Sequence, residues 1–326
     1  MQTVFEIYKE LQSNSSSVVD GFNIASLPSV KNHKLGISPN GQPMFFIKCD
    51  DSTETKSIDS NLEFISVQYN RECQLLTNKK KTADGIYTVI SLKTDSIDLQ
   101  EYFLEIVFLV VKKLSANPKL KELKIEVEKL INLFSKFSKP PSKTIQGLWA
   151  ELMVIEKSKN PEYLVRAWHN SMTDKFDFND GTDKIEVKST AKSRRVHTFS
   201  LEQLNPNKNS NLIIVSVFAV ETGIGKSIFD LVELIEKRVK ENELAIRINE
   251  ILAETLGTSF EKAFDVYFDY QLAADTIQYY QSNSIPAIEM KNIPKELSNV
   301  HFDSDLTDVI PLSKNISVST LHKSLF

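Results

Sequence analysis

Apolar and polar positions alternate most regularly in a short segment near the middle of the chain, residues 176–190. Large apolar residues alternate with charged ones on both sides of Asn179 to Asp183, a run of turn-forming residues. This pattern predicts a β-hairpin. Because side chains two residues apart share a face of a strand, Glu186 and Lys188 should point together, away from their apolar neighbours. Asp177, which lies between two phenylalanines, should likewise face away from the core.

The N-terminal part of the chain shows mostly strand patterns. Residues 1–11 have a helical period, and residues 13–17 interrupt it. β-branched and aromatic runs at 44–47, 62–69 and 86–92 are separated by Pro, Gly, Asn and Asp, which predicts strands. We therefore expect an N-terminal β-rich domain over residues 1–97.

Three helical patterns precede the hairpin, at residues 99–114, 120–137 and 145–158. Pro140 and Pro141 end the second one, and Ser142 or Thr144 can cap the third. In the third helix, an angle of about 100° per residue places Glu156 near the middle of the apolar stripe and Glu151 at its edge. Periodicity alone therefore favours Glu156 as the inward carboxylate.

After the hairpin, residues 211–220 form a nearly continuous apolar run typical of a strand buried on both faces. Gly225, Lys226 and Ser227 follow, but the glycine that a phosphate-binding loop needs five positions earlier is Val220. We therefore reject nucleotide binding there. Helical patterns continue to about residue 256, and strand-like runs follow at 263–270, 285–290 and 309–312. The expected division is a core over residues 98–256 and a C-terminal, strand-containing extension over 257–326.

Composition and charge limit the classes of function. The formal net charge is −4, so any nucleic-acid contact must be local. One basic excess lies at residues 184–208, next to the hairpin. Cys49 and Cys73 are the only cysteines, which excludes a disulfide framework and a cysteine-ligated zinc site. The chain has neither an apolar run of the ~18 residues that a membrane span needs nor a secretion signal, so we expect a soluble cytoplasmic protein.

The hairpin suggests a chemistry. Neighbouring strands lie about 4.7–4.9 Å apart, so carboxylates from Asp177 and Glu186 would lie close enough to repel each other unless a cation joins them. Mg²⁺, which prefers oxygen ligands, is the expected ion, and Lys188 beside it could position or activate a water molecule. A glycosidase built on two carboxylates would leave Lys188 and the basic excess unexplained. His169, next to Trp168, is by itself more typical of a packed, hydrogen-bonded residue than of a ligand.

Asp177, eight intervening residues and then Glu186-Val187-Lys188 resemble the PD-(D/E)XK nuclease signature, with Phe176 in place of the proline. Four segments resemble, in this order, a family of prokaryotic PD-(D/E)XK proteins of the restriction-endonuclease-like superfamily, encoded near restriction and phage-defence genes. They are residues 147–152, 167–169, 186–190 and 197–204. The resemblance is specific over residues 147–204.

The resemblance implies an α/β fold with a restriction-endonuclease-like core, a mixed central sheet and flanking helices. It implies a Mg²⁺-dependent DNA endonuclease, with Mn²⁺ as a substitute, acting in a restriction or phage-defence system. Asp177 and Glu186 would ligate the metal, and Lys188 would orient or deprotonate the attacking water. The resemblance favours Glu151 over Glu156 as the third carboxylate, holding a metal-bound water or a second ion.

The expected substrate contacts lie after the hairpin. Lys192, Arg194 and Arg195 would contact backbone phosphates, and His197 follows them as a further DNA contact. Gln203 is a substrate-binding candidate, although Ser200 and Gln203 are also spaced as an N-terminal capping box. DNA is the expected partner; other subunits of a defence system and a homodimer stay open. The alternative function is a DNA-binding or scaffolding subunit that keeps the fold without cleaving.

Overall fold

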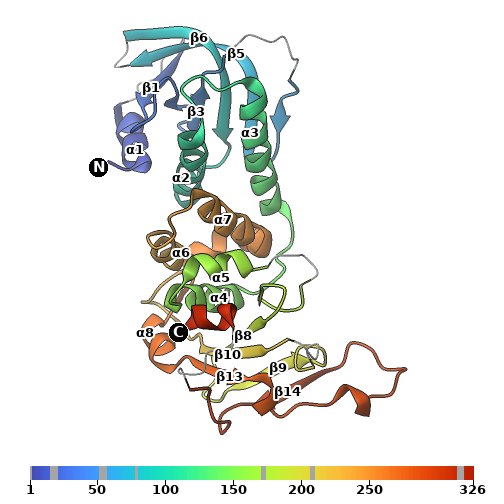
Figure 1. The fold of residues 1–326 in the computed structure, drawn as a ribbon. Helices are drawn as coiled ribbons and strands as arrows, with labels where there is room; N and C mark the ends of the chain where they lie inside the picture. The colour runs from blue at the N-terminus through green and yellow to red at the C-terminus, as the bar shows by residue number, and fades with distance from the viewer. Residues whose placement is uncertain are drawn as a thin grey trace. The chain divides into compact units, whose positions relative to one another are not determined.

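The computed structural model describes residues 2–14, 21–50, 57–77, 80–169, 174–205, 210–313 and 319–326, with the backbone alone for 80–83. The chain divides into two compact units, residues 1–140 and 141–326 (Figure 1). Each unit has its own sheets, and together they make a mixed α/β protein. Among the helices of the described residues, none is long and apolar enough to cross a membrane.

The first unit is built on a six-stranded sheet in the order β1-β2-β3-β6-β5-β4. An additional parallel pairing joins β1 to β5, with Phe22 beside Leu75, so that the sheet closes on itself there. Apolar side chains from its strands pack together in one cluster, with Phe46, Leu75 and Val89 among the buried residues. The elements are α1 (Val4–Asn14), β1 (Phe22–Ser26), β2 (Lys34–Ile37), β3 (Pro43–Ile47), β4 (Ser60–Asn61), β5 (Ile65–Thr77), β6 (Lys80–Leu92), α2 (Ile97–Lys113), α3 (Leu120–Ser135) and η1 (Lys136–Ser138).

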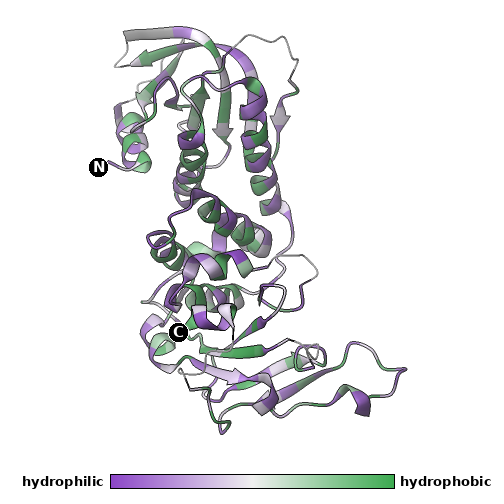
Figure 2. Cartoon of the chain, in the orientation of Figure 1, coloured by the Kyte–Doolittle hydropathy of each residue, from purple (hydrophilic) through white to green (hydrophobic). Residues whose placement is uncertain are grey.

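The predicted strands at 44–47, 62–69 and 86–92 correspond to β3, β5 and β6, and the predicted first helix is α1. The predicted domain boundary at residue 97 differs from the division of the structure at residue 140. The reason is that α2 is apolar around most of its circumference (Figure 2) and packs on β3, with ring centroids of Phe45 and Phe103 5.9 Å apart. Burial of that apolar surface keeps α2 with the first sheet.

The second unit is organised around a four-stranded sheet in the order β13-β10-β8-β7. Strands β8 and β10 are parallel, and the other two pairings are antiparallel. Helix α4 packs on β8 (Figure 1), and a two-stranded ribbon of β9 and β14 contributes Phe199 and Phe302 to an apolar cluster that also contains Ile214 of β10. The buried strand predicted at 211–220 is β10, in which every residue but Phe218 is buried.

The elements of the second unit are α4 (Ile145–Lys157), α5 (Pro161–Ala167), β7 (Phe178–Asn179), β8 (Lys184–Thr190), β9 (Val196–Ser200), β10 (Leu212–Phe218), β11 (Glu221–Thr222), α6 (Ile228–Glu236), α7 (Asn242–Leu256), η2 (Gly257–Ser259), η3 (Glu261–Asp265), β12 (Tyr267–Phe268), α8 (Tyr270–Thr276), β13 (Gln278–Gln281), η4 (Ser282–Ser284), η5 (Met290–Asn292), β14 (His301–Asp305) and α9 (Thr320–Leu325). The boundary predicted at residue 256 also differs from the observed division, because β13 pairs with β10 and β14 pairs with β9. Within the strand pattern at 263–270, residues 263–265 belong to the 3₁₀ helix η3 and Tyr267 and Phe268 form the short strand β12, and the tail forms its strands at β13 and β14 instead of 285–290 and 309–312.

The loop with Gly225 and Lys226 does not form a phosphate cradle. Lys226 exchanges two backbone hydrogen bonds with Phe268, and its carbonyl also accepts from the Trp149 indole at 2.9 Å. A Cβ at residue 225 would lie 2.1 Å from the Phe268 carbonyl oxygen, so the glycine is needed for this close approach. The loop therefore serves packing.

Candidate functional site

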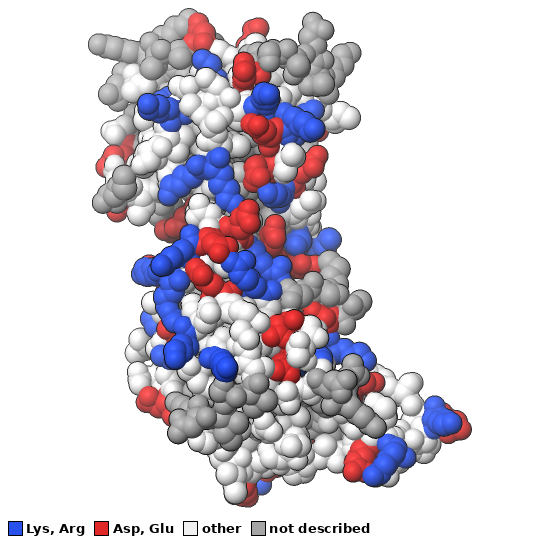
Figure 3. All heavy atoms as spheres, in the orientation of Figure 1, with Lys and Arg blue, Asp and Glu red and all other residues white. Residues whose placement is uncertain are grey.

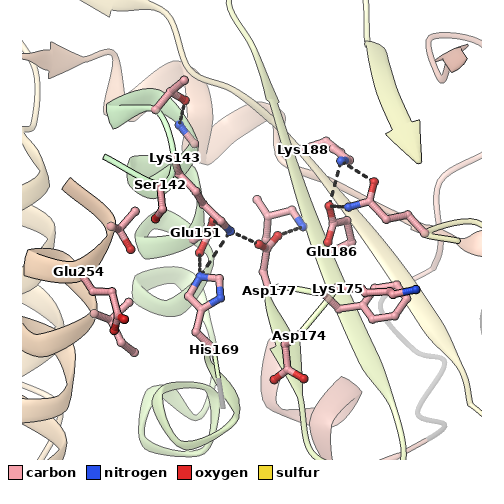
Figure 4. Close-up of a pocket in the computed structure, with 17 residues that line it drawn as sticks. Ser142, Lys143, Glu151, His169, Asp174, Lys175, Asp177, Glu186, Lys188 and Glu254 are labelled. Atoms are coloured by element: carbon pink, nitrogen blue, oxygen red, sulfur yellow. Dashed lines mark hydrogen bonds and ion pairs between the residues drawn. The ribbon is translucent and has the colours of Figure 1, made fainter. Parts of the chain in front are cut away.

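A cavity of about 710 Å³ opens in the second unit between the start of α4, the end of α7 and the β7–β8 hairpin (Figure 4). Acidic and basic side chains face each other across it. Its ionisable lining comprises Lys143, Glu151, His169, Asp174, Lys175, Asp177, Glu186, Lys188 and Glu254. All four predicted catalytic residues are therefore brought to one place, with no residue of the first unit among the described lining.

The hairpin itself is as predicted, although its first strand is short. β7 and β8 pair antiparallel with Phe178 opposite Ile185, so extension of the register by one residue puts Asp177 opposite Glu186. On the other side Trp168 bridges Phe178, and the His169 amide donates to the Asp177 carbonyl at 3.0 Å. Directly opposite residues of antiparallel strands are close neighbours. His169, Asp177 and Glu186 thus follow one another across three adjacent segments.

Helix α4 supplies Glu151. Thr144 caps the helix, its hydroxyl accepting from the Gly147 amide at 3.0 Å. Two turns later Glu151 is only 2% exposed, and its Oε2 accepts from the Trp168 indole at 2.7 Å and contacts His169 Nε2 at 2.7 Å. Glu156, which periodicity favoured, lies outside the pocket lining and binds the Tyr270 hydroxyl at 3.0 Å.

His169 has a backbone conformation that is uncommon for a residue with a side chain, at φ 44°. The conformation is held by the hydrogen bond of its amide to Asp177 and by Arg247, whose Nη2 binds the preceding Trp168 carbonyl at 2.6 Å. Backbone strain of this kind is concentrated at functional sites. The structure therefore gives His169 a larger part in the site than the sequence indicated.

Lys143 is the site residue that the sequence analysis missed. Its Nζ lies 2.6 Å from Glu151 Oε1, 2.5 Å from Asp177 Oδ1 and 3.4 Å from His169 Nε2 (Figure 4). The sequence signal was limited to a lysine next to the helix cap Thr144, and such a position does not show where a long, flexible side chain will point.

A second group of contacts surrounds Glu186. Its Oε1 lies 2.9 Å from Lys188 Nζ and accepts from Gln203 Nε2 at 2.5 Å, while Gln203 Oε1 accepts from Lys188 at 3.0 Å. Gln203 also makes the capping contacts with Ser200, at 3.1 and 3.3 Å. The reciprocal contacts of the predicted capping box are therefore present, although residues 201–204 form a turn and not a helix. They orient the Gln203 amide, which binds Glu186, and a contact of Gln203 with substrate stays a prediction.

Burial and neighbouring charges shift the carboxyl pKa values in opposite directions. Burial, followed by the nearby charge of Asp177, raises the pKa of Glu186 to about 8, against the opposing effect of Lys188. Burial and the charge of Glu151 also raise the pKa of Asp177. For Glu151, burial acts in the same upward direction, but the His169 hydrogen bond and the Lys143 charge outweigh it and lower the pKa to about 2. Crowded acidic groups beside a cavity are typical of catalytic and metal-binding sites.

The donor set fits a divalent cation. One ligand atom each from Glu151, His169 and Asp177 can be chosen so that all lie within 4.8 Å of one another. Two carboxylates suit Mg²⁺ or Mn²⁺, and of these two ions Mn²⁺ accepts an imidazole ligand more readily. The predicted metal ligands were Glu151, Asp177 and Glu186; the geometry groups His169 with the first two, and Glu186 contacts Lys188 and Gln203.

Two predicted DNA contacts are instead part of the interior. Arg195 is 5% exposed and donates to the Ser216 carbonyl, the Ser216 hydroxyl and the Thr276 carbonyl. His197 is 3% exposed, with Nε2 2.7 Å from the same hydroxyl. Neither residue lines the pocket. Burial among main-chain and hydroxyl partners explains both, so we do not retain them as phosphate contacts.

The other two predicted phosphate contacts lie on the surface. Lys192 and Arg194 are exposed in the turn after β8, and Arg194 forms an ion pair with Asp305. On the face drawn in Figure 3, acidic and basic groups are interspersed. Lys192 and Arg194 therefore remain the candidate phosphate contacts.

The sequence profile of one protein family matches residues 4–307, which include the whole pocket. Its description reads "Putative PD-(D/E)XK family member" (DUF4420). No curated protein and no solved structure shows significant similarity to the chain. PD-(D/E)XK proteins are usually nucleases and typically use a divalent metal ion, which fits the acidic pocket. The chain belongs to this PD-(D/E)XK family, DUF4420, as the Asp177 and Glu186-Val187-Lys188 motif had indicated.

Proposed function

We propose that the chain is a metal-dependent nuclease that hydrolyses DNA phosphodiester bonds, with a restriction-endonuclease-like core in the second unit and a role in prokaryotic restriction or phage defence. The observation that carries the proposal is the meeting of Glu151, Asp177, Glu186 and Lys188 in one pocket, from a helix and both arms of a hairpin. Membership of a PD-(D/E)XK family supports the class of reaction.

Glu151, His169 and Asp177 would hold the ion, and Glu186, opposite Asp177 in the hairpin register, is a proposed further ligand. Mg²⁺ is the proposed ion, with Mn²⁺ as a substitute. When bound, such an ion screens the negative charge that develops on the phosphate oxygens and lowers the pKa of water. The protein contributes a buried, preorganised set of ligands, because Trp168 and the Val187 amide fix one oxygen each of Glu151 and Asp177, both at 2.7 Å.

Lys188 is proposed to orient or deprotonate the attacking water. Its ammonium is held by Glu186 and Gln203 at 2.9 and 3.0 Å, and its side chain is still 18% exposed. A cation fixed in this way costs little reorganisation when negative charge develops beside it. Lys192 and Arg194 are proposed to contact backbone phosphates, which position DNA without reading its sequence.

The test is incubation of the purified chain with methylated plasmid, unmethylated plasmid and phage DNA, in Mg²⁺, Mn²⁺ or EDTA. We expect cleavage of at least one substrate with either metal and none in EDTA. DNA binding without cleavage of any of these substrates would instead favour the non-cleaving binding or scaffolding subunit.

A further inference from the structure

The ammonium group of Lys143 lies among the same atoms that form the candidate metal centre. It is 2.6 Å from Glu151 Oε1 and 2.5 Å from Asp177 Oδ1, and 3.4 Å from His169 Nε2. The Glu151 and Asp177 side chains are 3% and 7% exposed, whereas the Lys143 side chain is 34% exposed. Lys143 thus reaches from the pocket opening into a buried acidic pair.

A buried pair of carboxylates needs a positive charge nearby, and an ammonium with three donors can supply it. Mg²⁺ needs the same oxygen atoms at about 2.0–2.1 Å. A metal ion and an ammonium cannot both lie between Glu151 Oε1 and Asp177 Oδ1. Binding of one therefore excludes the other from this position.

The Lys143 side chain has room to move away from the two carboxylates. Its flexible four-carbon stem begins next to the cap of α4, outside the helix, and the side chain lines the cavity. Withdrawal of the ammonium requires no change in α4 or in the hairpin, because neither depends on Lys143 for a backbone hydrogen bond among the described contacts.

We propose that Lys143 is an exchangeable internal counter-ion, which holds Glu151 and Asp177 together in the metal-free protein and leaves them when a divalent cation binds. This inference rests on the proposed metal-dependent function and adds a competing ligand to it. Lys143 is thus a positioning residue that lowers the apparent affinity of the metal site.

Substitution of Lys143 by Met removes the charge and retains most of the side-chain volume. Calorimetry with Mn²⁺ on the full chain, without DNA, should show tighter binding, by roughly 5- to 150-fold, the usual range for coupling between two ligands. In EDTA, Lys143→Met should unfold at a lower temperature than the wild type, because two buried carboxylates lose their partner. Mn²⁺ should raise the unfolding temperature more in the variant than in the wild type.

Lys175→Met is the matched control, because Lys175 also lines the cavity and none of the described contacts joins it to Glu151 or Asp177. It removes the same charge without freeing a ligand atom, so it should change Mn²⁺ affinity much less than Lys143→Met does. Lys143→Arg provides a second test that retains the charge and therefore the fold. A guanidinium binds carboxylates through two parallel hydrogen bonds, so this variant should bind Mn²⁺ more weakly than the wild type.

Equal or weaker Mn²⁺ binding by folded Lys143→Met would overturn the exchange, as would equal or tighter binding by Lys143→Arg. If the wild type nevertheless cleaves DNA with Mg²⁺, the proposed function stands without the exchange. If the wild type neither binds Mn²⁺ nor cleaves DNA, both proposals fail.

Discussion

Two clusters of polar side chains, each built around buried charged groups, lie in the second unit and differ in how their charges are satisfied. The carboxylate cluster, Lys143, Glu151, His169 and Asp177, places two acidic groups together beside a cavity. The arginine cluster, Arg195, His197 and Ser216, joins one guanidinium to a hydroxyl and main-chain carbonyls, without an acidic group among these partners.

This difference in partners distinguishes a cluster that stabilises the fold from one that can bind a ligand. The side-chain hydrogen bonds of Arg195 and His197 end on β10 or α8, so the cluster joins β9 and the residue before it to β10. The carboxylate cluster crowds like charges, which is unfavourable for folding unless a cation compensates. Burial of a charged residue therefore does not mark a site by itself; crowding of like charges next to open space does.

The largest expected effect is on cleavage, from Asp177→Asn or Glu186→Gln. Each removes a carboxyl group that can ligate an ion and keeps the shape of the side chain, so DNA cleavage with Mg²⁺ should fall by more than the ~10²-fold typical of a lost outer partner of a metal ligand. Circular dichroism should show an intact fold. Glu156→Gln, on the same helix as Glu151 but outside the pocket, is the control and should retain cleavage; cleavage at the wild-type rate by Asp177→Asn would refute the site.

Arg195→Met tests the arginine cluster. Loss of the guanidinium leaves buried carbonyl groups without donors, so the free energy of unfolding should fall by about 3 kcal/mol. Denaturant titration measures this loss. DNA affinity per folded molecule should be unchanged, and a stable Arg195→Met protein with weak DNA binding would return Arg195 to the list of phosphate contacts.

His197 makes the arginine cluster sensitive to acid. Burial first, and then the charges of Lys188 and Arg195, lower its pKa in the folded state from 6.5 to about 4. Between these values the unfolded chain binds the proton and the folded chain does not, so this contribution to stability is complete above pH 6.5 and is lost as the pH falls towards 4. The loss approaches ~1.4 kcal/mol per pH unit.

His197→Gln keeps a donor for Ser216 but does not titrate. The unfolding temperature, measured from pH 7 to pH 4, should therefore fall less steeply in this variant than in the wild type. Parallel pH profiles for the two proteins would assign the acid sensitivity to other groups.

The smallest effect is expected from the double variant Lys192→Ala and Arg194→Ala. Stability should be unchanged because both side chains are exposed, and DNA affinity should fall about equally for all sequences. Since each lost phosphate contact removes about one released counterion, the log-log salt slope should flatten by up to roughly 2 units. An unchanged slope in a filter-binding or fluorescence titration would exclude these two residues from the DNA contact.

The hairpin was predictable because its determinants are local. Asp180 and Gly181 set the turn, and the alternation around Glu186 sets the face. Glu151 was not predictable from periodicity, because α4 is buried from Leu148 to Ile155 and has no single inward stripe. The resemblance to PD-(D/E)XK proteins, not the helical pattern, indicated the carboxylate that lines the pocket.

Arg195 and His197 were misread although a local signal was present. His197 is two residues from Phe199, so strand alternation places both on the buried face of β9, and Arg195 continues that series. Lys143 and His169 lacked such a signal. Their positions depend on where α4 and the segment before the hairpin lie in three dimensions, which no local pattern encodes.

Closure of the first unit's sheet has a consequence for folding order. The pairing of residues 22–23 with residues 75–76 spans more of the chain than any other described pairing in that sheet. Such long-range contacts carry a high entropic cost and form late. Until β1 arrives, β2 and the end of β5 are open edges, able to pair with another copy of the chain. In the folded unit, pairing with β1 covers both of these edges.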